Sequence, residues 1–273
     1  MSAHFIGIIG IPGDGKSHFA RSATLLGPTA VALTDPKEAS FYRAPSGVDF
    51  NPKQLVTLDE FYDLDWRPHL GAPKGLQAGG YTRLMRWLDQ QAEAKVPYVV
   101  LDTGTEASRL AQHECLKVAG VFSPGDIEYG RGYSGTDTLV LALWNECKRL
   151  HARGTTVIVT FHAGMKEGEG AGDAVKRTSM GKDPVTKEAI REWTFDDQLL
   201  AVGEGRNKTV QNWSASFDLW LYTKPTGFGP GRKFFVTALP DAVRPAKASV
   251  TWKEGAQPQR LPNTVGAVLD AIA

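Results

Sequence analysis

The sequence lacks any apolar run long enough to cross a membrane. Its longest apolar stretches, near 96–101 and 138–144, fall far short of the roughly 18 residues that a transmembrane helix needs. The first residues, MSAHFIGIIG, include no basic segment and reach glycine almost at once, so we expect no signal peptide. A chain with neither feature is expected in the cytoplasm, without a membrane partner.

Excess charge and abundant cysteine are also missing. The 31 Lys and Arg residues almost balance the 30 Asp and Glu residues, which excludes a polybasic coat protein or an acidic tail but leaves room for a local basic groove. Cys115 and Cys147 are too few for a disulfide framework or a four-ligand zinc site, so we expect two reduced, mostly buried thiols. The sequence has no internal repeat with a period of 20–50 residues, so we do not expect a repeat protein.

The segments that are present predict an α/β protein. With 42% hydrophobic residues over 273 positions, the chain fits one large domain covering 1–273. Apolar runs separated by helical patterns indicate a mostly parallel sheet covered on both faces, and the late runs 217–223 and 233–239 indicate an antiparallel pair at its edge. A hairpin insertion is expected within about 163–207, around 175–195. The expected strands are 5–9, 29–34, 54–58, 98–101 and 155–161, and the expected helices are 18–26, 81–94, 105–118, 137–151 and 263–272.

The strongest motif is the glycine-rich segment GIPGDGKS at 10–17. It fits G-x-x-x-x-G-K-[ST] at every fixed position, follows a predicted strand and opens a helix, which is the context that a phosphate-binding loop requires. Its glycines allow successive N–H groups to point inward toward phosphate, Lys16 reaches the β- and γ-oxygens, and the Ser17 hydroxyl binds Mg²⁺. The predicted nucleotide-binding residues are Gly10, Ile11, Pro12, Gly13, Asp14, Gly15, Lys16, Ser17 and His18.

Acidic and polar residues at other strand ends are candidates for the remaining chemistry. Asp102 ends the buried run YVVLD and is predicted to hold, through water, the Mg²⁺ that Ser17 binds. Glu38, after the run 29–34, is the first candidate for the base that activates water. Asp35 is the second, and Asp59 and Glu60 are rivals after 54–58. His162 ends the run 155–161, where a polar side chain is placed to sense the γ-phosphate.

Four segments together resemble the RecA-like core ATPases, most closely the small phage-encoded group that includes single-strand annealing and recombination proteins. They are GIPGDGKS (10–17), YVVLDTGTE (98–106), TTVIVTFHAG (155–164) and SASFDLWLY (214–222). The resemblance implies a RecA-like P-loop NTPase fold and use of ATP and Mg²⁺. It also implies a homo-oligomeric ring or filament, host cytoplasm as the location if the chain is phage-encoded, and cooperation with a single-strand-binding protein.

The same resemblance implies single-stranded DNA as a partner, held by loops at 120–136 and 163–207. Aromatic residues beside cations suit stacking on bases and contact with phosphates. Acidic residues such as Asp126 and Glu128 lie in the same loops, and ordinary solvated loops are the competing interpretation. The proposed DNA-contacting residues are Arg131, Tyr133, Lys176 and Arg177, with Phe122, Tyr129, Lys166 and Lys182 nearby.

The sequence departs from the family pattern around the base, where it reads Asp35-Pro36-Lys37-Glu38. A neighbouring subunit usually supplies a cation to such a site, and Lys247, Lys253 and Arg260 are candidates here. Two other functions remain open: a small-molecule (nucleoside-phosphate) kinase, and a nucleotide-binding assembly protein without catalysis. An ATPase assay with and without single-stranded DNA discriminates among the three.

Overall fold

The computed structural model describes residues 2–43, 49–63, 79–166, 180–182, 189–191, 198–201, 216–226, 233–240 and 246–273. The α-helices are α1 (Lys16–Arg21), α2 (Ala39–Arg43), α3 (Gly80–Ala94), α4 (Gly104–Ala119), α5 (Arg131–Ala152) and α7 (Val265–Asp270). The strands of the sheet are β1 (Phe5–Gly10), β2 (Thr29–Leu33), β3 (Leu55–Glu60), β4 (Tyr98–Asp102), β5 (Thr156–Lys166), β8 (Gln198–Ala201), β9 (Leu219–Thr226), β10 (Lys233–Thr237), β11 (Lys247–Ala248) and β12 (Leu261–Pro262).

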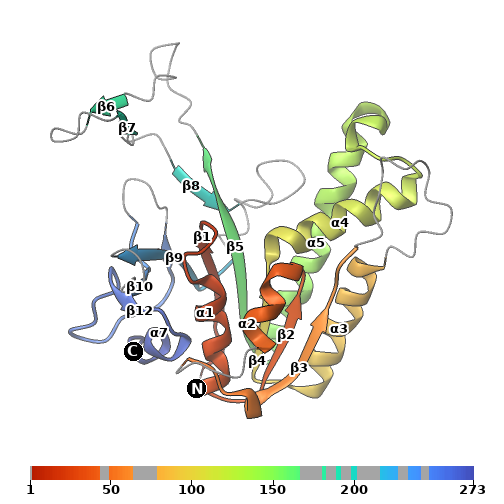
Figure 1. The fold of residues 1–273 in the computed structure, drawn as a ribbon. Coiled ribbons are helices and arrows are strands. Elements are labelled where there is room, and N and C mark those ends of the chain that lie inside the picture. The colour runs from red at the N-terminus through yellow and green to blue at the C-terminus, as the bar shows by residue number, and fades with distance from the viewer. Residues whose placement is uncertain are drawn as a thin grey trace.

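The sheet has the order β12-β10-β9-β1-β5-β4-β2-β3, with β11 paired to β9 and β8 paired to β5 (Figure 1). The central pairs from β9 to β3 are all parallel, whereas β10 runs antiparallel to β9 and β12 antiparallel to β10. This confirms the predicted mostly parallel sheet with antiparallel C-terminal strands. It also puts β5 between the strand that leads into the phosphate loop and the strand that ends at Asp102.

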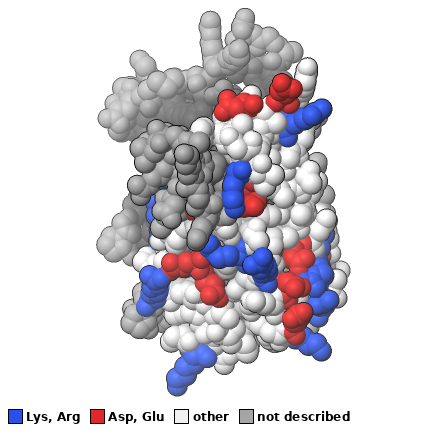
Figure 2. All heavy atoms as spheres, turned by 90° about the vertical axis from the view of Figure 1, so that its right-hand side faces the viewer, with Lys and Arg blue, Asp and Glu red and all other residues white. Residues whose placement is uncertain are grey.

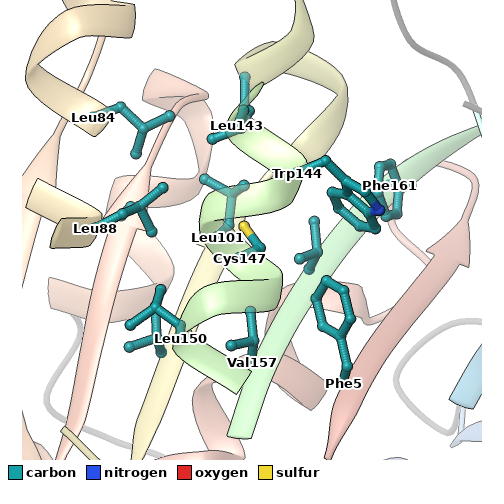
Figure 3. Close-up of a cluster of buried hydrophobic side chains, with 14 of the residues drawn as sticks. Phe5, Leu84, Leu88, Leu101, Leu143, Trp144, Cys147, Leu150, Val157 and Phe161 are labelled. Carbon is teal, nitrogen blue, oxygen red and sulfur yellow. The ribbon is translucent and has the colours of Figure 1, made fainter. Parts of the chain in front are cut away.

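Helices cover both faces of this sheet, so its central strands are buried on both sides. In β1, Phe5 and Ile9 point into one core, while Ile6 and Ile8 point into the other. Helices α3, α4 and α5 pack on the first face, and α1, α2 and α7 pack on the second. Figure 3 shows the first core, where the side chains of α5 meet strands β1, β4 and β5: Leu143, Trp144, Cys147 and Leu150 on the helix face Phe5, Leu101, Val157 and Phe161.

Several predicted boundaries were wrong, and tertiary contacts explain the differences. Strand β5 continues to Lys166, five residues past the predicted end, because β8 pairs with 163–166. Helix α5 begins at Arg131, so the last six residues of the predicted loop 120–136 are helical, and the rest contains the short 3₁₀ turns η5 (Pro124–Asp126) and η6 (Glu128–Gly130). Helix α1 ends at Arg21 and passes into a 3₁₀ turn, η1 (Ser22–Leu25).

The connection between β2 and β3 contains helix α2 and two 3₁₀ turns, η2 (Pro36–Glu38) and η3 (Pro52–Gln54). A short antiparallel pair, β6 (Met180–Lys182) and β7 (Ala189–Arg191), falls inside the predicted hairpin region 175–195. Cys147 is buried, Cys115 is half-buried, and both thiols are free, as expected. Among the described residues, no helix is both long and apolar enough to cross a membrane.

Candidate nucleotide site

The phosphate loop joins β1 to α1 and has the backbone shape that its glycines predict. Gly13 and Gly15 have φ angles of 83° and 85°, a region that other residues rarely adopt. Gly10 is needed for a different reason: a Cβ atom there would lie 1.9 Å from Oγ1 of Thr223 on β9. The loop therefore adopts the turn that presents backbone N–H groups and the start of α1 to an anion.

Lys16 lies within this loop and is 5% exposed. Its Nζ donates hydrogen bonds to the carbonyl oxygens of Gly10 at 2.9 Å and Ile11 at 3.0 Å. Burial lowers the pKa of Lys16, and the negative charges of Asp102 and Glu38 partly offset that effect. The ammonium group is thus held at the loop by neutral carbonyls, which a phosphate can replace as partners.

Asp102 ends β4 and is fully buried. Oδ2 accepts a hydrogen bond from the Tyr42 hydroxyl at 2.9 Å, and Oδ1 accepts one from the Thr160 hydroxyl. Burial raises the pKa of Asp102, while the hydrogen bonds from Thr160 and Tyr42, followed by the nearby Ser17 side chain, act in the opposite direction. The carboxylate is therefore held next to the Ser17 side chain, as the sequence predicted, although Tyr42 and Thr160 were not among the predicted residues.

Glu38, the predicted base, contacts the phosphate loop directly. The Ser17 hydroxyl donates a hydrogen bond of 2.6 Å to Oε2 of Glu38. Burial, followed by the nearby charge of Asp102, raises the pKa of Glu38. Ser17, Glu38 and Asp102 thus form a group of oxygen atoms beside Lys16, and oxygen is the donor that Mg²⁺ prefers. A hydroxyl and one carboxylate fit this ion, which usually keeps several waters and binds substrate phosphates as well.

His162 lies in the middle of β5, beside Gly10 of β1, rather than at a strand end. Its Nε2 is 3.8 Å from Oδ2 of Asp35, the second candidate base, and its backbone N–H donates to Thr105 Oγ1 at 3.0 Å. Burial, then the charge of Lys16, lowers the pKa of His162. The fold therefore joins two residues that the sequence singled out separately, at the margin of the phosphate loop.

A pocket opens beside the loop and has aromatic walls. It is lined by Gly13, Gly15, Lys16, Ser17, His18, Glu38, Phe41 and Phe234. The His18 ring is stacked on Phe234 with centroids 6.3 Å apart, and it meets Phe41 edge-on at 5.4 Å. Phe41 and Phe234 come from α2 and β10, far from the motif in sequence, so no local pattern marked them.

The rival acids have other partners. Asp59 accepts hydrogen bonds from Trp87 Nε1 at 2.7 Å and Thr57 Oγ1 at 2.6 Å, and Glu60 pairs with Arg43. Both lie on β3, at the edge of the sheet, with β4 and β2 between it and β5. Glu38 and Asp35 therefore remain the candidates that contact the other predicted site residues.

The C-terminal cations make contacts within the chain. Lys247 Nζ donates to the carbonyl of Phe217 at 3.2 Å, Lys253 Nζ donates to the carbonyl of Asp270 at 2.7 Å, and Arg260 lies over the Phe235 ring at 4.3 Å. Asn263, which the sequence did not single out, donates to the Gly15 carbonyl at 2.9 Å. The C-terminal segment thus braces the phosphate loop of its own chain.

The candidate DNA residues fall in two places. Arg131 and Tyr133 lie in the first turn of α5, where Arg131 is exposed and Tyr133 is 41% exposed. Tyr129 precedes them and is 90% exposed. On the face of the molecule drawn in Figure 2, Lys and Arg are interspersed with Asp and Glu over the described surface, without a continuous basic stripe. Lys176 and Arg177 lie outside the described residues.

Comparison with known proteins agrees with this geometry. Residues 3–210 match the model of a family described as an AAA domain. The match covers more than half of the chain, so the chain belongs to the AAA domain family, and it is a P-loop ATPase that binds and hydrolyses nucleotide. The match and the sheet described above confirm the predicted RecA-like P-loop NTPase fold.

Two further comparisons complete this result. No curated protein sequence matches the chain. Among solved structures, it is similar to a KaiC-like protein from the hyperthermophilic archaeon Pyrococcus horikoshii OT3, at 10% identity and a TM-score of 0.42, over 86% of this chain and 79% of that one.

Proposed function

We propose that this ATPase uses ATP with Mg²⁺ and couples its hydrolysis to single-stranded DNA in phage recombination, annealing or replication. The observation that carries the nucleotide part is the convergence of Lys16, Ser17, Glu38 and Asp102 at one loop. These residues come from three elements that only the fold brings together. The aromatic pocket beside them offers flat surfaces that suit a nucleobase.

The roles follow from the contacts. Lys16 exchanges its two carbonyl partners for phosphate oxygens, and the loop N–H groups bind the remaining oxygens. Ser17 and Asp102 would hold Mg²⁺, which when bound neutralises charge on the phosphates. When Ser17 gives up its hydrogen bond to Glu38, the Glu38 carboxylate is free to accept a proton from water. Its raised pKa suits that task near neutral pH.

Substitution of Glu38 tests this assignment. Glu38→Gln keeps the size of the side chain and its contact with Ser17, so we expect nucleotide binding to persist while turnover falls by about 10²–10⁴-fold, the usual share of a general base. Glu93→Gln, an exposed change on α3, is the matched control. If Glu38→Gln turned over ATP at the wild-type rate, Glu38 would not be the base, and Asp35, which contacts His162, would be the remaining candidate.

The DNA part of the proposal is supported by the exposed aromatic residues around the start of α5. Tyr129 and Tyr133 flank Arg131, and bases stack readily on such rings. This site lies at the far end of α4 from Asp102: the 16 residues of that helix span about 24 Å. DNA contact there is therefore separable from the chemistry of hydrolysis.

Binding of fluorescent oligo(dT) over a salt series tests it. We expect Tyr133→Ala to weaken binding by the ~1–3 kcal/mol of one stacked base. Arg131→Ala should flatten the slope of log binding constant against log salt concentration by roughly 0.7. The Lys176→Ala, Arg177→Ala double variant should flatten it by about the same amount for each cation removed. Arg153→Ala, at the other end of α5, is the control. If the wild-type chain does not bind oligo(dT) at low salt with ATP present, the DNA part of the proposal is refuted and the nucleotide part is unaffected.

Self-association belongs to the same proposal. We expect sedimentation with an ATP analogue to show a homo-oligomer, with a cation of one subunit completing the site of the next, and a single-strand-binding protein as a further partner. His162, between the loop and the extended end of β5, would transmit the presence of the γ-phosphate. We expect His162→Ala to retain DNA affinity without ATP but to lose its dependence on ATP.

A further inference from the structure

The Asp102 carboxylate is held by two hydroxyl groups that approach it from different elements. Tyr42 belongs to α2 and donates to Oδ2 at 2.9 Å, whereas Thr160 belongs to β5 and donates to Oδ1. An ionised carboxylate offers about four acceptor directions, so two donors fix its plane and leave other directions open. The Ser17 side chain also lies close to Asp102.

Packing holds the Tyr42 hydroxyl in place. The Tyr42 side chain is 2% exposed and belongs to the core on the α1 and α2 face of the sheet. Thr160 is fully buried in β5, which pairs directly with β4. Neither hydroxyl can turn to water, so both remain directed at the carboxylate.

We propose that Tyr42 is a positioning residue that, together with Thr160, fixes the Asp102 carboxylate toward Ser17 and thereby sets the affinity for the divalent cation that accompanies the nucleotide. The inference rests on the proposed function, in which Ser17 and Asp102 hold Mg²⁺. Loss of an outer hydrogen bond to a metal-ligating carboxylate typically lowers metal affinity by 10–100-fold, because the carboxylate is then free to rotate.

The position of Tyr42 gives this role a structural consequence. It lies in the segment 36–43, which also supplies Glu38 to Ser17 and Phe41 to the pocket wall. The carbonyl of Phe41 accepts a hydrogen bond from Arg21 of α1 at 2.9 Å. One short segment therefore contacts the metal carboxylate, the metal hydroxyl and the pocket, so its placement and cation binding are coupled.

The test is a titration of Mn²⁺ or Mg²⁺ into the full chain with a fluorescent ATP analogue, read as the cation concentration that gives half of the metal-dependent increase in nucleotide affinity. Tyr42→Phe keeps the ring and removes only the hydroxyl. We expect this concentration to rise by about 10-fold or more. Nucleotide affinity without metal should not change, because Lys16 and the loop are untouched.

Three further variants make the result specific. Tyr81→Phe removes another hydroxyl, which donates to the Leu139 carbonyl at 2.7 Å in the opposite core, and we expect wild-type metal dependence. Thr160→Val should weaken cation binding as Tyr42→Phe does. Thr160→Ser keeps the hydroxyl and should bind the cation as the wild type does. The Thr160 pair carries the test if Tyr42→Phe does not fold, as judged by circular dichroism.

Wild-type metal dependence in both Tyr42→Phe and Thr160→Val overturns this inference. If Asp102→Asn loses metal dependence in the same experiment, the proposed function survives that outcome. If the wild-type chain binds nucleotide without any response to divalent cation, the failure lies in the proposed function itself.

Discussion

Replacing Lys16 with methionine tests the phosphate loop most directly. The ammonium group is almost fully buried, and in the absence of phosphate it satisfies two loop carbonyls. In the bound state we expect it to contact two phosphate oxygens instead. Hydrogen bonds to charged groups contribute about 1.5–3 kcal/mol each, so loss of both weakens binding by about 3 kcal/mol or more. That corresponds to roughly 100-fold in Kd.

Ligand-induced thermal stabilisation converts this difference into a measurable shift. At a nucleotide concentration of 100 times the wild-type Kd, binding stabilises the wild-type fold by about 2.7 kcal/mol, whereas a 100-fold weaker variant gains about 0.4 kcal/mol. With about 2–4 °C per kcal/mol for a chain near this size, Tm should rise by roughly 5–10 °C in the wild type and by about 1 °C in Lys16→Met.

The assay is differential scanning calorimetry with a non-hydrolysable ATP analogue and Mg²⁺. Lys148→Met removes an exposed lysine from α5 and should keep the full wild-type shift. If Lys16→Met showed the same nucleotide-induced shift as the wild type, Lys16 would not contact the phosphates of the bound nucleotide.

Three more outcomes follow from other contacts. Gly10→Ala should abolish nucleotide binding, because the new Cβ would lie 1.9 Å from Thr223 Oγ1. Adding Thr223→Ala should partly restore binding in the same titration, because the nearest remaining atoms would then lie 3.2 Å from that Cβ. Burial alone would raise the pKa of Asp49, but its hydrogen bonds, led by Arg21, lower it. Its stabilising effect is therefore complete above its unfolded-state pKa and is lost as pH falls through its folded-state pKa. Asp49→Asn should lose about 3 kcal/mol at neutral pH and converge with the wild type in acid, measured by urea unfolding. Leu88→Ala, in the core under α3, should lower unfolding free energy by about 2–5 kcal/mol, and a loss below 1 kcal/mol would contradict the packing in Figure 3.

Much of the fold was predictable because its signals are local. The run FIGIIG followed by a glycine-rich turn and Lys16 specifies a strand, an anion-binding loop and a helix over only 17 residues. Helix α3 was predicted to within one residue from its apolar spacing and the proline that follows it. Buried strands such as YVVLD are nearly continuous apolar runs, and that pattern alone indicates a sheet covered on both faces.

Boundaries set by pairing with distant segments were not predictable. Strand β5 runs past His162 because β8 pairs with it. The start of α5, which was predicted as loop, packs closely on the turn at 124–126: a Cβ on Gly132 would lie 2.5 Å from the Pro124 carbonyl oxygen. These contacts join residues that local periodicity cannot relate.

Which loop binds phosphate could be recognised from the amino-acid sequence, because that chemistry lies in eight consecutive residues whose backbone angles and side chains are set locally. The sequence also indicated Asp102 and Glu38, since the carboxyl ends of parallel strands meet at one edge of the sheet. Three other features depend on the folded arrangement: Glu38 contacts Ser17, Tyr42 and Thr160 hold Asp102, and Phe41 and Phe234 line the pocket. Those partners come from α2, β5 and β10, and their side chains meet only when the sheet order places β5 between β1 and β4 and the helices close over its faces.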